Sequence, residues 1–569
     1  MFWTAVNFNF IKIVLLLSGF ALFYFLSIRE TPIYDETEGQ YAGAVRAMES
    51  YLEIPTNNGI PRLQKPPLTY WLMKLSASFI KNDEYAMRVP FIVMILGLLL
   101  TTYAIGVEIM DPFRALMATT VLGLSFGLFI FGRMVMPEIV FSFFIAMTFW
   151  ASIKALLAVT YSARLRWWTL GWVMMACASF AKGFHGLFWP LTVLGIARAM
   201  SLFQPEAWSG FWRLRNLILF LVITLPWYVA VELKYPGYIL DNLWNEQMGH
   251  ALNFRFPLTY SQVSLFHYLL QHLFLLFPIL LLTPHALQKW RKSQDRDDQK
   301  QTQKLLLIVP GVILVSTLFS ARQDYYSMAS WFSFSILAVV GLHSRDRSVW
   351  LAFPFWIFFG LGVSLFVLGS IWSGNINNAL RSDSTDHLFS ILFQLPTEMR
   401  SLFFISAITL LIGGMSGVYL VRKQKNSLIL IAFIIAMLGP LWGTSKGVRI
   451  LSDSFSLKKT ALYISLIPHT AVIVDGVAPI SSSLFYYLEE KIFFVRANPF
   501  AEYATRKYEI GREQYLDFDK FLVSWKSEQR LLLIIHAKDR EFWRKVIGEM
   551  FFESEEGRSG SRLLIKNHL

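Results

Sequence analysis

Carboxylates follow directly on the first long apolar segment of the chain. Residues 34–51 read YDETEGQYAGAVRAMESY, in which Asp35 and Glu36 are adjacent and Glu38 follows two positions later. A carboxylate at this place could orient or deprotonate an acceptor group at a membrane surface. The stretch also fits a capped helix, with Asp35 as the N-cap and Glu38 reaching back to the backbone. The local sequence leaves both interpretations open.

Three cations and a further acid occur in similar short polar stretches. These are Lys65 in LQKPPLTYW (63–71), Lys182 in AKGFHG (181–186), Arg322 in ARQDYYS (321–327) and Glu138 in GRMVMPE (132–138). The cations could hold a phosphate or pyrophosphate, and Glu138 could act on an acceptor. Each also has a structural interpretation. Lys65 could flank a stiff Pro-Pro turn, and Lys182 could belong to the C-cap of a helix. Glu138 could lie in the first turn of a helix, where an acid favours the helix dipole. Arg322 could form an ion pair with Asp324.

Aromatic residues accompany these charges. Tyr70, Trp227 and Tyr228 lie in or near the same set of stretches, and Tyr325 stands three residues after Arg322. Aromatic side chains suit sugar rings and the lipid–water interface. We therefore expect Tyr70, Trp227 and Tyr228, together with Glu36, to line an acceptor or sugar pocket.

The composition places these residues in a polytopic helical membrane protein. Of 569 residues, 55% are hydrophobic and 16% are charged, whereas a soluble domain carries about 25% charged residues. The net charge of +13 could suit nucleic acid, but the bases lie between apolar runs and are better explained as topology signals. We expect a lipid bilayer and no nucleic acid as partner. The one cysteine, Cys177, excludes an internal disulfide.

The hydropathy pattern predicts about thirteen membrane spans, because a span needs roughly 20 apolar residues. The first run lacks a small-x-small cleavage site and is expected to remain as a span. The expected spans are 10–28, 86–107, 114–131, 138–159, 167–181, 185–203, 216–233, 267–287, 304–320, 325–343, 349–372, 400–421 and 427–444.

Lysines and arginines in the short loops predict the orientation. With the N-terminus inside, the cytoplasmic loops and their flanks carry seventeen of them, and the opposite short loops carry one each, at Arg133, Lys182, Arg322 and Arg381. We expect a cytoplasmic N-terminus, a periplasmic C-terminus and a bacterial inner membrane. The long connections 29–85 and 234–266 then lie outside, as do all the polar stretches described above. Charges close to hydrocarbon mark functional cavities, so their convergence predicts one cavity at the outer leaflet.

The chain changes character after about residue 445. TAVIVDG and RLLLIIHA are strand-like apolar runs, and ISSSLFYYLEE and FDKFLVSWKSE have the helical spacing of apolar residues. We expect residues 1–444 to form a membrane domain and residues 445–569 a small periplasmic α/β domain.

The ordered set of polar stretches resembles a known family. DETEGQYA (35–42), QKPPLTYW (64–71), GRMVMPE (132–138), AKGFHG (181–186), PWYVAVELKYPGY (226–238) and ARQDYYSMASWFSFSILA (321–338) occur in family order. The family is that of the bacterial glycosyltransferases with the GT-C fold, related to the lipid A aminoarabinose transferase (ArnT) and to protein O-mannosyltransferases, glycosyltransferase family 83. No single motif is specific, and the resemblance rests on the ordered set along nearly the whole chain.

The resemblance implies an inverting transfer of a sugar from a polyprenyl phosphate, usually undecaprenyl phosphate, at the periplasmic face. It implies that Asp35 is the catalytic carboxylate, that Lys65 holds the lipid-linked phosphate, and that Arg322 and Tyr325 lie near that phosphate. We expect Lys182 to assist them.

Two positions depart from the family pattern. Gln64 stands where the family often has a glutamate that can ligate a metal, and a neutral amide is a poor zinc ligand. This argues against a divalent metal held at this position, and the sequence does not decide whether a metal binds elsewhere. Glu138 stands where the family often has aspartate, which keeps the charge and lengthens the reach.

Three functions fit these residues. They are an ArnT-like transferase acting on lipid A or another envelope glycolipid, a protein O-mannosyltransferase-like enzyme, and a transporter of lipid-linked sugars. Transporters tend to show internal repeats and interrupted midplane spans, and no repeat is apparent in the sequence, which favours an enzyme. Neither the sugar nor the acceptor follows from the sequence. A phosphate acceptor would need no base, whereas a hydroxyl would.

Overall fold

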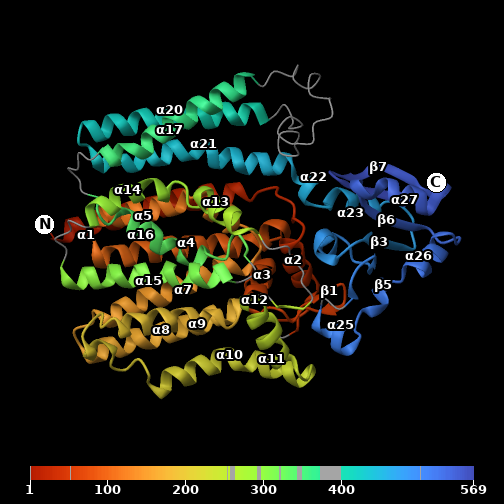
Figure 1. Ribbon diagram of the computed structural model, residues 1–569, viewed down its shortest axis with the longest axis horizontal. Coiled ribbons are helices and arrows are strands. Elements are labelled where there is room, and N and C mark those ends of the chain that lie inside the picture. The colour runs from red at the N-terminus through yellow and green to blue at the C-terminus, as the bar shows by residue number, and fades with distance from the viewer. Residues whose placement is uncertain are drawn as a thin grey trace.

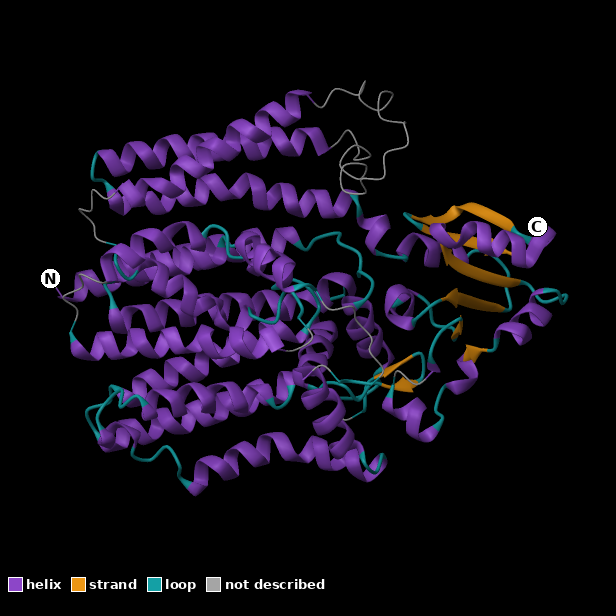
Figure 2. Ribbon diagram, viewed as in Figure 1, coloured by secondary structure: helices purple, strands orange, loops and turns teal. Residues whose placement is uncertain are grey.

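Long apolar helices running side by side form the larger part of the molecule in this computed structural model, and a smaller unit with a β-sheet lies at one end (Figures 1 and 2). The structure describes residues 2–51, 53–81, 83–252, 254–256, 263–290, 296–319, 322–342, 349–371, 399–499 and 502–568. Arg381 and parts of the predicted loop 234–266 lie outside these ranges.

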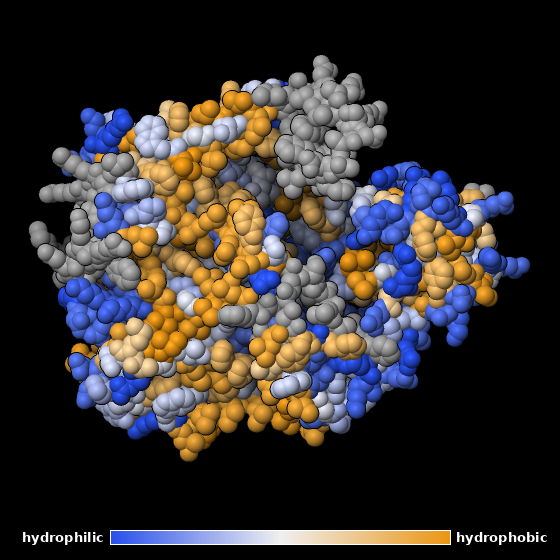
Figure 3. Space-filling model, viewed as in Figure 1, coloured by the Kyte–Doolittle hydropathy of each residue, from blue (hydrophilic) through white to orange (hydrophobic). Residues whose placement is uncertain are grey.

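The helical part contains the elements expected of a membrane protein. They are α1 (Phe2–Ser27), α4 (Asp83–Ile109), α5 (Pro112–Gly123), α6 (Phe126–Phe131), α7 (Pro137–Leu156), α8 (Tyr161–Lys182), α9 (His185–Ala199), α10 (Leu214–Lys234), α13 (Leu265–Leu275), α14 (Ile279–Trp290), α15 (Asp297–Phe319), α16 (Trp331–Val339), α17 (Val349–Ile371), α20 (Met399–Arg422) and α21 (Ile429–Ile450). Hydrophobic residues predominate along the middle of this part, and hydrophilic residues are prominent at its left end and on the β-sheet unit at the right (Figure 3).

The expected count of thirteen spans is not confirmed. Among the described residues, eight helices are long and apolar enough to cross a membrane, or nine if α13 and α14, which meet at 89°, form one broken span. Each predicted segment contains a helix, but some are short or interrupted: segment 114–131 is divided into α5 and α6. The break is tolerated because the freed backbone groups find partners inside the protein, as Phe126 N–H does at the Phe277 carbonyl (3.1 Å).

The C-terminal unit is a three-layer α/β structure. Its strands are β3 (Ala471–Asp475), β4 (Ile492–Val495), β5 (Tyr515–Leu516), β6 (Leu531–His536), β7 (Phe552–Ser559) and β8 (Arg562–Lys566), in the sheet order β5-β4-β3-β6-β8-β7. The first four in this order are parallel, whereas β8 pairs antiparallel with β6, and β7 pairs antiparallel with β8. The apolar cores on the two faces are completed by α23 (Lys458–Ile464) and α24 (Leu484–Tyr487) on one side and by α26 (Phe518–Trp525) and α27 (Arg540–Ile547) on the other.

The strand-like runs of the sequence correspond to β3 and β6, whereas α21 continues to Ile450, past the predicted boundary at residue 445. The division of the chain into domains at that residue therefore stays a prediction.

Short elements fill the layer between the helices and the sheet (Figure 1). They are α2 (Thr37–Ala47), β1 (Thr56–Asn57), β2 (Ile60–Pro61), α3 (Leu68–Phe79), α11 (Tyr238–Asp241), α12 (Gly249–Leu252), α22 (Ser452–Phe455) and α25 (Tyr503–Tyr508). The turn between β1 and β2 has positive φ at Asn58 (53°) and Gly59 (78°), which an Asn-Gly pair adopts readily. The Asn58 side chain donates to the Ile492 carbonyl (2.7 Å) and accepts from its N–H (3.0 Å), so the hairpin docks on β4.

Candidate active site

A polar cavity of about 300 Å³ lies where the helices, the intermediate layer and the C-terminal sheet meet. Five of the site residues expected from the sequence line it, namely Glu36, Lys65, Glu138, Lys182 and Tyr325, and so does Gln64. We call it the donor cavity. The loops after β3 and β4 form its wall on the C-terminal side through residues 477–480, Asn498 and Glu502. They leave the carboxyl ends of parallel strands, the edge at which α/β sheets present ligand-binding loops.

Glu138 and Lys182 pair with each other inside the donor cavity. Glu138 is the second residue of α7 and Lys182 the last residue of α8, and their Oε1 and Nζ atoms are 3.2 Å apart. The Lys182 ammonium also lies 4.5 Å from the centre of the Tyr326 ring. Glu138 Oε2 is buried and has no hydrogen-bond partner among the described residues. This leaves one oxygen that can accept a proton or a hydrogen bond from a ligand.

Lys65 differs from Lys182 in its partners. Within the part of the chain that the structure describes, its ammonium forms no hydrogen bond or ion pair. Burial lowers its pKa to about 8, Glu246 acts in the opposite direction, and Lys182 adds to the lowering. A half-buried cation of this kind can bind an anion without first breaking an ion pair.

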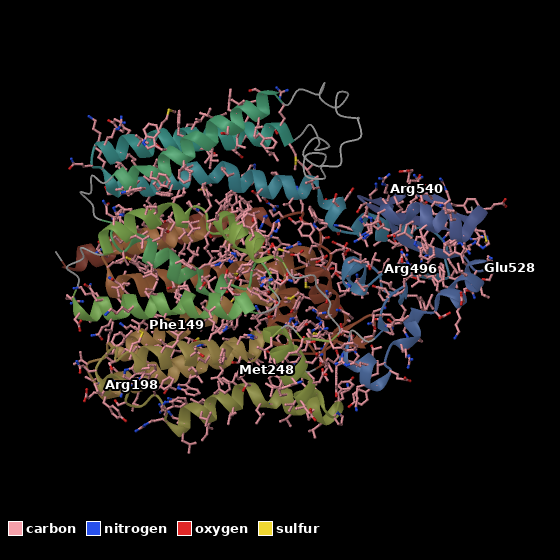
Figure 4. The ribbon with its side chains drawn as sticks, viewed as in Figure 1. Phe149, Arg198, Met248, Arg496, Glu528 and Arg540 are labelled. Carbon is pink, nitrogen blue, oxygen red and sulfur yellow. The ribbon has the colours of Figure 1, made fainter. Side chains whose placement is uncertain are left out.

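A second cavity of about 270 Å³ adjoins the first and is mostly apolar. Phe184, Phe188, Trp189, Met248 and Leu252 supply its apolar lining (Met248 is labelled in Figure 4). Both cavities are lined by Lys65, Lys182, Glu246, His250 and Tyr326. The cations therefore stand at the junction of a polar and an apolar space, an arrangement that suits a phosphate attached to a hydrocarbon chain.

The structure adds charged residues that the sequence analysis did not select. Arg255 Nε and Nη2 lie 2.9 and 2.6 Å from Glu246 Oε1. Burial raises the pKa of Glu246, but Arg255 outweighs it and the pKa lies below its usual range. Burial and the nearby Lys65 lower the pKa of His250 to about 3, so this imidazole is neutral. Glu246 belongs to a polar run, Asn245-Glu246-Gln247, which could have pointed to it.

Glu502 comes from the C-terminal unit and faces Gln64. Gln64 Nε2 donates to both carboxylate oxygens of Glu502 at 2.9 Å, and burial raises the pKa of Glu502. The residues here do not fit a metal. The Gln64 amide presents a donor, and no group of three or more His, Cys, Asp or Glu residues suited to a metal ion occurs in the described ranges. The chemistry derived below uses no metal.

Asp35 lies in a third cavity, of about 400 Å³, next to the donor cavity. The two share Glu36 and Ile480 as lining residues. Asp35 Oδ1 accepts hydrogen bonds from Ser483 N–H (2.8 Å) and Ser483 Oγ (2.6 Å), both in the C-terminal unit. Burial raises the pKa of Asp35 to about 6, against the effect of these two hydrogen bonds. We call this space the Asp35 cavity.

The interpretation of Asp35 as a helix cap is wrong. Helix α2 begins at Thr37, and its N-cap residue is Glu36, whose side chain forms no capping bond. Glu36 has a φ of 63°, a left-handed conformation that is costly for a non-glycine residue and is concentrated at functional sites. Its exposed side chain lies between the two cavities, while Asp35 is turned towards Ser483.

Glu38 does reach back, since Tyr34 N–H donates to it (3.0 Å), and it is fully buried. It also accepts from Val135 N–H (2.9 Å) and Arg88 Nε (3.1 Å). One carboxylate thus joins the loop before α2, the segment before α7, and α4.

Four of the expected site residues do not line the donor cavity or the Asp35 cavity. Tyr70 is fully buried, accepts from Arg62 Nε (2.9 Å) and stacks on Tyr41. Trp227 lines an apolar groove beside α8 and α10, and Tyr228 stacks on Tyr238. Arg322 donates to the Val263 and Leu318 carbonyls (2.7 and 3.1 Å). Hydrophobic packing and backbone contacts hold these side chains, so the structure does not support a sugar pocket made of the three aromatic residues.

Comparison with known proteins agrees with this architecture. Residues 12–240 match the family model described as dolichyl-phosphate-mannose-protein mannosyltransferase. The undecaprenyl phosphate-alpha-4-amino-4-deoxy-L-arabinose arabinosyl transferase of Pseudomonas paraeruginosa is 29% identical over 241 residues, 41% of this chain and 43% of that protein. The chain thus spans less than half the length of the arabinosyl transferases that it matches.

Structural similarity extends along the whole chain. The crystal structure of ArnT from Cupriavidus metallidurans bound to undecaprenyl phosphate superposes with a TM-score of 0.74 at 16% identity, covering 98% of both chains. The apo structure of the same protein gives a TM-score of 0.73 at 15% identity. The chain therefore has the fold of ArnT, as expected from the sequence, and is a multi-pass membrane protein. In sequence over part of its length, and in fold over nearly all of it, the chain is similar to proteins of this name.

Proposed function

We propose that the protein is a glycosyltransferase that moves a sugar from a polyprenyl-phosphate donor to an acceptor at the periplasmic face of a bacterial inner membrane. The observation that carries the proposal is Lys65, whose ammonium has no partner in the described structure and stands between a polar and an apolar cavity. The names of the similar proteins support it, because the Pseudomonas relative acts from undecaprenyl phosphate and the Cupriavidus structure holds that lipid.

In this proposal the apolar cavity, the two lysines and Asp35 each have a separate role. The apolar cavity takes the start of the prenyl chain, and Lys65 and Lys182 stabilise the phosphate as it leaves the anomeric carbon. Asp35 orients the acceptor, and takes its proton if the acceptor is a hydroxyl. The resemblance implies a reaction that inverts the anomeric carbon, in which the acceptor and the leaving phosphate would occupy opposite sides of the sugar.

Lipid A or another envelope glycolipid is the proposed acceptor, by analogy with the aminoarabinose transferases. The family match over residues 12–240 favours a second candidate, a protein acceptor as in protein O-mannosyltransferases. Mass spectrometry of lipid A and of exported proteins, with and without the protein, separates the two. A sugar that appears only on exported proteins would contradict the lipid A assignment.

The transfer step is tested in membranes with a labelled undecaprenyl-phosphate sugar. Asp35→Asn should abolish transfer while leaving donor binding intact. Normal turnover by this variant would contradict the catalytic role of Asp35, and turnover by no form of the protein would contradict the proposed function itself.

A further inference from the structure

A groove of about 1050 Å³ lies beside α10, and the proposed reaction does not use it. Its walls come from α2, α3, α8 and α10 and from the segment between α2 and β1, and we call it the α10 groove. Among the described residues it shares no lining residue with the donor cavity, the adjoining apolar cavity or the Asp35 cavity. We propose that the α10 groove holds one phosphatidylethanolamine molecule, a phospholipid with a zwitterionic headgroup, which is not a substrate of the transfer.

The interior of the α10 groove is apolar and partly aromatic. Its lining on α10 includes Val222, Ile223, Pro226, Trp227 and Ala230. On the other walls, Trp71 packs edge to face against Phe180 and Trp227, with ring centres 5.3 and 6.4 Å apart. Trp227, which the sequence analysis places in a sugar pocket, thus belongs to a surface that suits hydrocarbon. An empty groove of this size would forfeit dispersion contacts along its walls, and a lipid chain restores them.

Two exposed side chains of opposite charge complete the lining. Lys234 is the last residue of α10, and Glu53 lies in the segment that leads from α2 to β1. Glu53 Oε2 accepts from the N–H groups of Glu49 and Ser50 (2.6 and 3.2 Å). Within the described ranges neither Lys234 nor Glu53 forms an ion pair. A cation and an anion together complement the phosphate and the ammonium of a zwitterionic headgroup, whereas Glu53 would repel a headgroup that carries only negative charge.

The length of the α10 groove matches one leaflet of a bilayer. Its lining on α10 begins at Val222 and ends at Lys234, twelve positions later, which is about 18 Å of helix. The hydrocarbon of one leaflet is about 15 Å thick. Lys234 lies at the end of α10 that leads to α11 and the intermediate layer (Figure 1). A phospholipid in the leaflet nearest the C-terminal unit would therefore place its headgroup at Lys234 and Glu53 and an acyl chain along α10.

The bound lipid would support the part of the chain that completes the donor cavity. It fills the space between α10 and α3, both of which line the α10 groove. Helix α10 leads through α11 to Glu246, which lines the donor cavity. The prenyl donor has a different place, since Lys65 lines the donor cavity and the adjoining apolar cavity but not the α10 groove. The lipid thus has a structural role, and the proposal does not depend on which sugar or acceptor the protein uses.

Native mass spectrometry of the full-length protein in detergent tests the headgroup assignment. The protein is titrated with phosphatidylethanolamine and with phosphatidylglycerol, whose headgroup has the phosphate but no ammonium. We expect the wild type to bind phosphatidylethanolamine at least about tenfold more tightly, the effect of one charged contact. Lys234→Gln should weaken the binding of both lipids. Glu53→Gln keeps an oxygen for the Ser50 N–H and should lose the preference, and Glu53→Lys should reverse it.

Two neighbouring positions on α10 give a matched pair of variants for the apolar part. Ala230 lines the α10 groove, whereas Val229 is exposed and does not line it. Ala230→Trp should fill the groove and bind phosphatidylethanolamine at least about tenfold more weakly, because the lipid loses its apolar contacts. Val229→Trp adds the same side chain outside the groove and should bind the lipid like the wild type.

Cys177 reports whether the groove is occupied, because it lines the groove and is the one cysteine of the chain. Phosphatidylethanolamine should slow the alkylation of wild-type Cys177 by N-ethylmaleimide, and phosphatidylglycerol should slow it less. Undecaprenyl phosphate should leave the bound phosphatidylethanolamine in place. Displacement by undecaprenyl phosphate at equal concentration would make the groove a donor site and overturn the proposal. Equal binding of the two phospholipids by the wild type, or unchanged binding by Ala230→Trp, would also overturn it.

Discussion

Single residues in the candidate active site differ most in whether their charge is already satisfied. Lys182 has Glu138, Arg255 has Glu246, and Arg88 has Glu38. Lys65 has no such partner in the described structure, which makes it the cation best able to bind a donor phosphate.

Removing the Lys65 charge should weaken donor use. Charged hydrogen bonds contribute about 1.5–3 kcal/mol, so Lys65→Met should lower kcat/KM for the donor about 10- to 100-fold. Because the pKa of Lys65 is lowered to about 8, the wild-type kcat/KM for the donor should fall as pH rises through 8. Lys65→Arg stays charged and should lose this alkaline decline. Steady-state kinetics from pH 6 to 10 measure both effects. The control is Lys520→Met, which replaces an exposed lysine and should leave kcat/KM unchanged. If kcat/KM of Lys65→Arg falls with pH as it does in the wild type, Lys65 is not the group that titrates.

The ionised form of Asp35 should lower the stability of the folded protein. Its pKa is raised to about 6 in the fold, so the folded state favours the protonated form and loses stability as pH rises from about 4 to 6. Asn keeps an oxygen for Ser483 and has no charge to bury. Asp35→Asn should therefore be more stable than wild type at pH 7, by up to about 3 kcal/mol for a shift of about two pKa units, and equal to it below pH 4. Thermal unfolding in detergent across this range measures the difference, and a gap that does not change with pH would contradict the shifted pKa.

The sequence located much of this site because its motifs carry charge at the ends of apolar runs. Lys65, Glu138 and Lys182 could be found in this way, and they do meet. Glu502 could not, because it stands in no motif and reaches Gln64 only through the fold of the C-terminal unit. Arg133 lies in the GRMVMPE stretch, but no role follows for it from the sequence, and its place in the lining of the Asp35 cavity is visible only in the structure.

At the scale of elements, the buried Glu38–Arg88 pair positions the active-site loop. Glu38 on α2 is fully buried, Arg88 on α4 is 2% exposed, and their contacts fix the residues that precede α2. The strained backbone at Glu36 depends on such contacts, since a left-handed non-glycine residue persists only where its surroundings enforce it. Sequence periodicity placed a helix here, but the partner of Glu38 lies 50 residues along the chain and has no local signal.

Breaking this pair should destabilise the protein strongly. Arg88→Leu leaves Glu38 buried and unpaired, which costs about 3–5 kcal/mol. The double variant E38Q/R88M removes both charges and should recover much of the loss. Arg46→Leu is the control, because Arg46 on α2 pairs with the exposed Glu489, and such pairs contribute less than about 1 kcal/mol. Chemical denaturation in detergent measures the free energy of unfolding of the three variants. If Arg88→Leu loses no more stability than Arg46→Leu, the Glu38–Arg88 pair does not stabilise the fold.

At the scale of the whole molecule, the α/β unit closes the site from outside the helical part. Ser483 contacts Asp35, Glu502 contacts Gln64, and Ile492 holds the tip of the β1–β2 hairpin. The apolar patterns at residues 470–476 and 530–537 indicated that such a unit exists. They did not indicate where it sits, because docking depends on polar contacts spread over distant loops.

The arrangement of the two ends leads to a prediction about sidedness. Arg198 lies near the end of the helical part that holds the N-terminus, and Glu528 lies in the C-terminal unit at the opposite end (Figures 1 and 4). The excess of Lys and Arg in the loops predicts that the Arg198 end is cytoplasmic. The chain has one cysteine, so Cys177→Ser gives a background in which single cysteines can be introduced. Arg198→Cys and Glu528→Cys both replace exposed residues.

A membrane-impermeant thiol reagent should label Glu528→Cys in cells whose outer membrane has been permeabilised and whose inner membrane is intact. Arg198→Cys should react only after the inner membrane is disrupted, because the impermeant reagent cannot cross that membrane from the periplasm. The two positions are matched controls for each other, since both should react equally in detergent. Labelling of Arg198→Cys in intact cells, with protection of Glu528→Cys, would invert the topology. It would place the donor cavity and the Asp35 cavity on the cytoplasmic side, where nucleotide sugars are available and a polyprenyl-phosphate donor would no longer be required.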